Sequence, residues 1–445
     1  MSIVRNISKT VNYGKKNGYM EAAFAAWERL TANYYKNYTY VEPEASILEE
    51  QRKGQEPIKF SIIVPAFETP KQYMEALIDC CLAQTYSNFE LIIADGSASS
   101  LVEDTVKAYE DARIRYQRLE KNGGISENTN EGIRLATGQY CCLVDHDDLL
   151  TKDALFEVAK AIMQAKDEPV LLYSDEDKCD ESATRFYDPH MKLDFNFDLL
   201  LTNNYICHLT VIKTEVLSYL QIRKQYDGAQ DYDLVLRVVS SLFLKEKEGF
   251  GKKIESFIVH VPKVLYHWRC HSGSTADNPN SKMYAYEAGR KALADYTNRV
   301  GWKADIRHNK HLGFYRIAYR NDVLSHREDL AAVGGLTASK GKVVSGIYKG
   351  MPLVYAGYMN RMDLYQNVNV LDIRNLAVNK NYQKLYEDVS GHPYQSTFAS
   401  DETLLPDWMK KLSREEVENL NKKLSKQLKQ SGARLLLDPE SVRKL

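Results

Sequence analysis

Apolar runs and amphipathic stretches alternate along the chain between residues 58 and 174. Four continuous apolar runs and one alternating run predict strands, at 58–67, 89–94, 113–119, 140–144 and 169–174. Apolar positions at helical spacing predict the intervening helices, at 71–86, 100–111, 125–136 and 151–163. This order predicts an α/β fold with a mainly parallel sheet flanked by helices. Ligands of such sheets bind at the carboxyl ends of the strands.

The pattern changes on either side of this region. Beyond residue 175 the alternation weakens, with strands predicted at 204–212 and 257–268 and helices at 231–243 and 281–300. Before it, the apolar spacing predicts a helix over 21–35. From Trp408 onward an apolar stripe predicts a helix that docks on the chain or joins two copies as a homo-oligomer: Leu412, Val417, Leu420, Leu424 and Leu428.

These changes predict four parts of the chain. They are a helical N-terminal extension (1–56), an α/β domain (57–320, with halves 57–174 and 175–320), a small β-rich region (321–400) and an amphipathic helical tail (401–445).

The composition narrows the class of protein. The 445 residues include 59 Lys and Arg against 60 Asp and Glu, and 44% are hydrophobic, which is typical of a globular protein. The balanced charge argues against a general nucleic-acid-binding protein, so no nucleic acid partner is expected. Tyrosine is enriched, with 30 residues against 13 phenylalanines, and suits both sugar stacking and half-buried strand positions.

The cysteines and the N-terminal residues predict the cellular compartment of the protein. The seven cysteines show no C-x-x-C spacing, which predicts buried free thiols in a reducing compartment. A signal peptide and a membrane-spanning apolar run are both missing from the pattern, so we expect a cytoplasmic protein. Basic N-terminal residues either form a solvated helix face or attract the chain to anionic lipid at the inner face of the plasma membrane: Arg5, Lys9, Lys15 and Lys16.

Candidate chemistry follows the predicted strand ends. Pro65 closes the first strand, Asp95 follows the second, and DHDD (145–148) follows the strand at 140–144. Three carboxylates within four positions repel one another unless a cation lies among them. Oxygen ligands suit Mn²⁺ or Mg²⁺, and such ions commonly bridge substrate phosphates. The alternative is a solvated turn in which Asp148 caps the next helix.

Two further segments have weaker signals. Gly123 and Gly124 open the predicted helix at 125–136, where free amides favour a phosphate, although Gly-Gly before a helix is usually an ordinary turn. The acidic run YSDEDK (173–178) follows a strand and is either part of a site or a charged surface loop.

From Phe60 to about Tyr319 the chain resembles the inverting glycosyltransferase family two, which has the GT-A fold. The resemblance rests on SIIVPAFETP, LAQTYSNFELIIADGSAS, EKNGGISENTNEG, LATGQYCCLVDHDDLL, YSDEDK, NYICHLTVIKTEVL, GAQDYDLVLRV and VPKVLYHWR. Within the family it is most similar to enzymes of bacterial cell-surface polysaccharide assembly, including rhamnan-type polymers. The resemblance implies a nucleoside diphosphate sugar linked to uridine or deoxythymidine, a divalent cation, and inversion at the anomeric carbon.

The resemblance also implies roles for individual residues. Asp231 falls where the family has its catalytic base, and Arg269 would contact the diphosphate. The metal positions are Asp145, Asp147 and His267. The nucleotide positions are Pro65, Ala66, Phe67, Glu68, Asp95, Gly123, Asn130 and Asp145. The donor-sugar or acceptor positions are Asp175, Glu176, Asp177, His208 and Gln230.

Two departures from the family pattern lie in the nucleotide pocket and leave the base open. The family often has Asn where this chain has Glu68, and Asp where it has Ala94. Residues 321–400 resemble the later part of a second domain of the same kind without a donor site, or form an unrelated β-rich extension.

The physical requirement for a base supports Asp231 independently of the resemblance. An inverting transfer needs one group that takes the acceptor hydroxyl proton during attack at the anomeric carbon. The alternative is that Asp231 only caps a helix, and Asp233 lies further into that helix.

The sequence therefore predicts a metal-dependent hexosyl- or deoxyhexosyl-type transferase acting on a lipid-linked or oligosaccharide acceptor. A catalytically degenerate scaffold subunit of a polysaccharide-assembly complex is the alternative. A sugar-phosphate nucleotidyltransferase fits less well, because VPAFETP lacks a glycine-rich turn with a basic residue.

Overall fold

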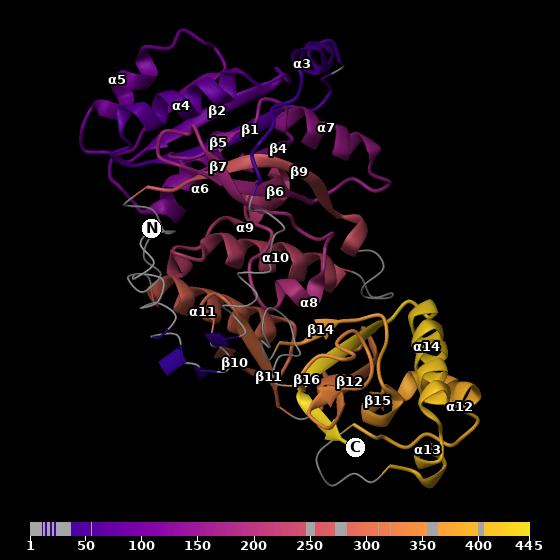
Figure 1. Ribbon diagram of the computed structural model, residues 1–445. Helices are drawn as coiled ribbons and strands as arrows, with labels where there is room; N and C mark the ends of the chain where they lie inside the picture. Colours follow the sequence, from indigo (N-terminus) through magenta and orange to yellow (C-terminus); the bar gives the residue numbers. More distant parts are fainter. Residues whose placement is uncertain are drawn as a thin grey trace.

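Figure 1 shows the computed structural model, in which a larger α/β domain is joined to a smaller C-terminal unit. The structure describes residues 37–54, 56–245, 254–271, 283–309, 311–320, 322–353, 364–398 and 405–445, with a few isolated positions before residue 24. The helix predicted over 21–35 and most of the basic N-terminal residues lie outside the described residues.

A nine-stranded sheet forms the centre of the larger domain. Its first half has the parallel order β3-β2-β1-β4, formed by β1 (Phe60–Ala66), β2 (Phe89–Asp95), β3 (Ile114–Arg118) and β4 (Tyr140–Leu143). The second half continues through β8 (Thr210–Lys213), β6 (Leu171–Cys179), β9 (Ile258–Arg269) and β5 (Leu149–Leu150), and β7 (Phe186–His190) pairs with β6. Strand β8 is antiparallel to both neighbours, whereas β6 and β9 are parallel.

Helices cover both faces of this sheet (Figure 1). One face packs against α4 (Lys71–Leu82), α5 (Leu101–Lys107) and α7 (Ala154–Gln164). The other packs against α6 (Ile125–Leu135), α8 (Phe197–Leu200), α9 (Thr214–Leu220), α10 (Gln230–Lys245) and α11 (Met283–Arg299). Ile62 and Ile63 accordingly point into different cores. Burial on both faces explains the continuous apolar runs and confirms the predicted fold class.

Two predicted strands differ in the structure. The strand predicted over 204–212 begins only at Thr210, so His208 lies in the segment before β8 and not in a strand. The acidic run predicted at a strand end lies inside β6, which continues to Cys179. The hairpin of β10 (Ala304–His308) and β11 (Tyr315–Tyr319) ends the larger domain.

Residues 37–54 pack on the larger domain. The Tyr38 hydroxyl donates to Asp177 at 2.7 Å, and helix α3 (Ala45–Gln51) accepts a hydrogen bond from Thr85 on its Gln51 side chain. All seven cysteines are free, and four of them are buried. Among the helices that the structure describes, none has the length and apolar character required to cross a membrane.

The C-terminal unit has its own sheet and core. Its strands are β12 (Leu330–Ser339), β13 (Lys342–Val343), β14 (Gln366–Asn367), β15 (Leu376–Val378) and β16 (Arg434–Lys444). Its helices are α12 (Gln383–Ser390), α13 (Asp407–Lys410) and α14 (Arg414–Gln430).

This unit corrects the predicted tail. Strand β16 pairs with β12 and β14, so a boundary at residue 400 would divide one sheet, and the last residues are strand and not helix. The apolar stripe of α14 packs into the core of the unit through Val417, Leu424 and Leu428. The stripe therefore docks within the chain, and these residues do not supply the predicted oligomer contact.

Buried ion pairs connect the unit to the larger domain. The Arg327 guanidinium contacts Asp198 at 2.8 Å and Asp329 at 2.7 Å, and all three side chains are nearly inaccessible to solvent. A second pair joins Arg434 on β16 to the partly exposed Glu255 at 2.5 Å. Because a buried charge without a partner is costly, the Arg327 pairs hold the two parts in a defined arrangement.

Replacing Arg327→Ala should lower the free energy of unfolding by about 3–5 kcal/mol, because Asp198 then stays buried without its cation. Arg320→Ala is the matched control, since Arg320 and Asp305 form an exposed pair and its loss should cost less than about 1 kcal/mol. Urea denaturation measures the free energy of unfolding of both variants. Equal losses of stability would contradict the role of Arg327 as a buried ion-pair partner.

Candidate active site

The acidic loop after β4 is tied to strand β9. Asp148 is buried, accepts a hydrogen bond from the Tyr266 hydroxyl at 2.5 Å, and accepts another from the Arg269 backbone N–H at 2.7 Å. Burial raises the pKa of Asp148 well above its usual range, and Asp147 and Asp145 add to the rise. Asp148 is therefore an anchor of the loop and not a helix cap, and Asp153 occupies the N-cap of α7.

The other two carboxylates of the loop are less enclosed. Asp147 Oδ2 lies 2.9 Å from His271 Nε2, and Asp145 Oδ2 lies 3.9 Å from His208 Nε2. Partial burial raises the pKa of Asp145; His208 opposes the rise, and Asp147 and Asp231 add to it. The carboxylate of Asp231 is thus part of the same electrostatic environment as the acidic loop.

His267 has a different contact from the predicted one. Its Nδ1 lies 2.5 Å from Asp177 Oδ1, and its ring packs against Tyr40 and Phe186. The imidazole that contacts Asp147 in the described residues is His271. The prediction placed the metal position on the histidine inside β9, whereas the structure brings the histidine just after β9 to the loop.

Arg269 holds the acidic loop. Its Nε donates to the Asp147 carbonyl at 2.6 Å and one amino group donates to the Glu181 carbonyl at 2.7 Å. Its other amino group is buried and has no hydrogen-bond partner within the described residues. Arg269 therefore positions Asp147 and keeps one unsatisfied donor.

The donor atoms at this loop suit a hard divalent cation. Among the described residues no group of three His, Cys, Asp or Glu side chains forms an all-protein metal site. Asp145 and Asp147 offer two carboxylates from one short loop. Mg²⁺ and similar ions are commonly held by one or two carboxylates plus waters and substrate phosphates, so the residues fit such an ion.

Each carboxylate of the acidic run inside β6 has its own side-chain partners. Asp175 lies 2.9 Å from His260 Nε2, and the Asp177 carboxylate contacts His267 Nδ1 and the Tyr38 hydroxyl. Both carboxylates are buried, so the predicted donor-sugar or acceptor contact is not supported for these two residues, nor is a surface loop.

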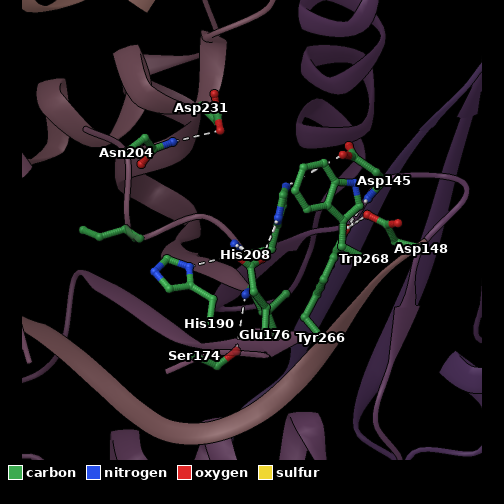
Figure 2. Close-up of polar contacts among 12 residues, drawn as sticks. Asp145, Asp148, Ser174, Glu176, His190, Asn204, His208, Asp231, Tyr266 and Trp268 are labelled. Atoms are coloured by element: carbon green, nitrogen blue, oxygen red, sulfur yellow. Dashed lines mark hydrogen bonds and ion pairs between the residues drawn. The ribbon is translucent and has the colours of Figure 1, made fainter. Parts of the chain in front are cut away.

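Glu176 organises a buried charge cluster, which Figure 2 shows beneath the acidic loop. Its carboxylate lies 2.9 Å from His208 Nδ1, 3.2 Å from His190 Nδ1 and 3.8 Å from the buried Lys192 ammonium. Burial opposes ionisation of Glu176, but Lys192, His190 and His208 outweigh it and hold its pKa well below the usual range. Glu176 is therefore an anion at neutral pH.

His208 is the cation that faces the site. It stacks on Tyr266 with ring centroids 4.8 Å apart, and Glu176 also accepts its backbone N–H at 2.8 Å. Burial opposes its protonation, yet the neighbouring Cys207 and Glu176 raise the pKa of His208 well above 6.5. The fixed imidazolium thus presents its other nitrogen toward Asp145.

Asp231 lies in the first turn of α10, and Figure 2 shows it across from Asp145, with the His208 ring between them. Asn204 Nδ2 donates to Asp231 Oδ2 at 2.9 Å. Within the described residues Asp231 has no cationic partner, whereas Asp233 is buried and paired with Arg223 and Arg237. Asp233 is therefore structural, and Asp231 is the carboxylate of α10 that remains for chemistry.

The nucleotide positions at the ends of β1 and β2 lie side by side. Pro65 and Ala66 end β1, Phe67 is 47% exposed, and the Glu68 carboxylate accepts the Ala98 N–H at 2.7 Å. Asp95 is fully buried and accepts hydrogen bonds from Ser97 and Tyr116. Glu68, one of the departures from the family pattern, thus bridges the two strand-end loops.

Three predicted positions have other partners. Both polar atoms of the Asn130 side chain bond the Ile222 backbone at 2.8 Å, so Asn130 joins α6 to the segment around Ile222. The Gly123 amide donates to Asn128, and Gln230 accepts the Gly228 amide. The Gly-Gly turn therefore does not leave a free Gly123 amide for a phosphate.

A cavity of about 390 Å³ adjoins the charge cluster. Glu176, His190, Asn203 and Trp268 are among the residues that line it. Trp268, His190, Lys192 and Asn204 are not among the predicted site residues. Asn204 and Trp268 lie in NYICHLTVIKTEVL and VPKVLYHWR, two of the segments that carry the resemblance, and this was the available signal. His190 and Lys192 lie outside all of those segments.

A mostly parallel sheet with an acidic loop after its central strand and a carboxylate at the start of a later helix is the arrangement of GT-A transferases. The model of the family described as Glycosyl transferase family 2 matches residues 61–220. Glycosyltransferase GlyG of Streptococcus pneumoniae serotype 4 is 33% identical over 235 residues, which cover 48% of this chain and 71% of GlyG. The chain belongs to glycosyltransferase family 2 and has the GT-A fold.

Other relatives are much longer. Uncharacterized protein y4gI of Sinorhizobium fredii is 38% identical over 248 residues, 55% of this chain and 26% of y4gI. O-antigen biosynthesis protein RfbC of Myxococcus xanthus is 29% identical over 250 residues, 55% of this chain and 18% of RfbC. The chain thus spans a minor part of both relatives. The crystal structure of S. aureus TarS 1–349 with UDP matches 54% of this chain and 65% of that TarS fragment, with 19% identity and a TM-score of 0.39.

Replacing Glu176→Gln should lower the free energy of unfolding by about 3–5 kcal/mol at neutral pH, because Lys192 stays buried without its anion. The folded-state pKa of Glu176 lies below its ordinary value of 4.5, so the wild-type advantage is present above pH 4.5 and shrinks as the pH falls below it. Urea denaturation across this range measures the difference.

Glu215→Gln is the control for this variant, because the Glu215 side chain is 70% exposed beside Lys213. It should change stability by less than about 1 kcal/mol at every pH. A Glu176→Gln loss of the same small size, or one that does not depend on pH, would contradict the charge cluster.

Proposed function

We propose that this chain is an inverting glycosyltransferase that moves a hexosyl or deoxyhexosyl group from a nucleoside diphosphate sugar to a glycan hydroxyl. The observation that carries the proposal is Asp231, a carboxylate without a cationic partner in the described residues, across from Asp145 and His208 (Figure 2). Asn204 fixes one oxygen of Asp231, which leaves the other to accept the hydroxyl proton.

Proton removal by Asp231 accompanies attack of the acceptor oxygen on the anomeric carbon, while the bond to the diphosphate breaks on the opposite side. The configuration of the sugar inverts as a result. Asp145 and Asp147 would hold the divalent cation, Mn²⁺ or Mg²⁺, which when bound neutralises charge on the diphosphate. We assign the unpartnered amino group of Arg269 to a phosphate oxygen and the His208 imidazolium to the same side of the donor.

The donor side is formed by the ends of β1 and β2, where Asp95 and Glu68 order the loops for a UDP- or dTDP-linked sugar. The cavity beside Trp268 and His190 is the proposed acceptor position. The similarity to RfbC, an O-antigen biosynthesis protein, supports a bacterial surface polysaccharide as the product and a lipid-linked glycan as the acceptor. Such an acceptor would bring the protein to the inner face of the plasma membrane.

The test begins with thermal shifts of the full chain with nucleotide sugars and Mn²⁺ or Mg²⁺. Binding of a donor to the folded state raises the melting temperature by mass action, and EDTA should remove the metal-dependent part of the shift. The donor found in this way is then used to measure hydrolysis or transfer. Donor binding without any turnover would favour the scaffold alternative.

Asp231→Asn should bind that donor with the wild-type thermal shift and reduce turnover by about 10²–10⁴-fold, because the proton acceptor acts only in the transition state. Asp305→Asn is the matched control, since Asp305 is exposed on β10 beside Arg320, and it should turn over normally. Normal turnover of Asp231→Asn would show that the base lies elsewhere.

A further inference from the structure

A second and larger cleft lies between the larger domain and the C-terminal unit. Its volume is about 1690 Å³, and none of the predicted site residues lines it. One wall contains Trp302 and the turn η4 (Val323–Ser325), and the other contains residues 377–383 and 431–433. Sites for small molecules usually have about 300–1,000 Å³, so this cleft suits an extended ligand.

Partly exposed aromatic rings line the cleft. Tyr365, Tyr382, Tyr394 and Phe398 come from the C-terminal unit, and His326 comes from the opposite wall. Tyr382 and Tyr394 pack on the core of the unit and also border the cleft. A flat ring with a polar edge offers an apolar face to the C–H face of a sugar and a hydrogen bond to a hydroxyl.

The polar groups between these rings are mostly neutral or acidic. Asn381 is exposed beside Tyr382. The backbone N–H of Asn381 donates a hydrogen bond to the Asn379 side chain. Among the described lining residues the basic side chains are Lys380 and His326. The carboxylates are Asp322, Glu328, Asp329 and Asp438, of which Asp329 and Asp438 are already paired with Arg327 and Arg316. Phosphate recognition generally uses arginine or lysine clusters, so this lining disfavours a nucleotide or a phosphate-rich polymer and favours an uncharged polyol.

We propose that the cleft is a second binding site, separate from the transfer site, for the uncharged glycan chain that the enzyme extends. The choice of a glycan as the occupant rests on the proposed function. One wall of the cleft belongs to the half of the larger domain that contains Asp231. Val300 and Trp302 follow α11, and α11 packs along α10, which has Asp231 in its first turn. A chain held there would keep the acceptor on the protein between transfers.

The test is binding of the full chain, in EDTA and without donor, to a printed array of neutral and acidic bacterial polysaccharides. The wild type should bind at least one neutral polysaccharide, and Tyr382→Ala should lower that affinity by about tenfold. Asn381→Ala should lower it several-fold, and this exposed position gives a variant whose folding is not at risk. Tyr219→Ala is the control, because Tyr219 is 87% exposed on α9 and does not line the cleft.

Three results would overturn the inference. The first is that the protein binds no polysaccharide, and the second is that it binds only acidic ones. The third is that Trp268→Ala abolishes binding while Tyr382→Ala and Asn381→Ala leave binding intact. The last result would place the glycan at the transfer site. Binding that depends on Tyr382 in a protein that turns over no donor would support the cleft and contradict the proposed function, so the two failures are distinguishable.

Discussion

The buried carboxylate of Glu176 is the contact on which the arrangement of the site depends. An anion inside a strand of a covered sheet is unfavourable unless cations or hydrogen-bond donors surround it. Lys192 and His208 supply the positive charge, and His190 adds a side-chain contact at 3.2 Å. Lys192 also donates to the carbonyl groups of Ile206 and His208, so the same cluster holds the segment before β8. That segment directs the His208 ring toward Asp145.

The same physical rule separates structural carboxylates from those left for chemistry. Asp148, Asp233 and Asp198 are buried and each has a hydroxyl donor or an arginine as a partner. Asp145 and Asp231 are more accessible and are held by weaker or neutral contacts, 3.9 Å from His208 and 2.9 Å from Asn204 respectively. A carboxylate that the fold does not neutralise is the one that can bind a cation or take a proton.

The sequence predicted the fold well because its strands are buried on both faces and their apolar runs are continuous. It also placed the acidic loop and Asp231 in one domain, since strand ends and a helix start are readable from the pattern. It misplaced YSDEDK, because the histidines and the lysine that contact its carboxylates are distant in sequence. It assigned Asn130 to the nucleotide, because a bond to Ile222 has no sequence signature.

The C-terminal unit shows another limit of the pattern. Strand β16 was predicted as helix because the stripe of α14 precedes it, and its partner β12 lies about a hundred residues earlier, between Leu330 and Ser339. Pairing over such a separation depends on tertiary packing and not on local periodicity. The ion pairs of Arg327 and Arg434 are likewise formed between segments that only the fold brings together.

In the proposed reaction Asp231 removes a proton while the acceptor attacks the donor from the side opposite the diphosphate. The decisive measurement is the anomeric configuration of the first transfer product, determined by proton NMR as soon as the product forms. A donor with an α-linked diphosphate should give a β-linked product. An α-linked product would mean that the configuration is retained, and it would contradict a single displacement with Asp231 as the base.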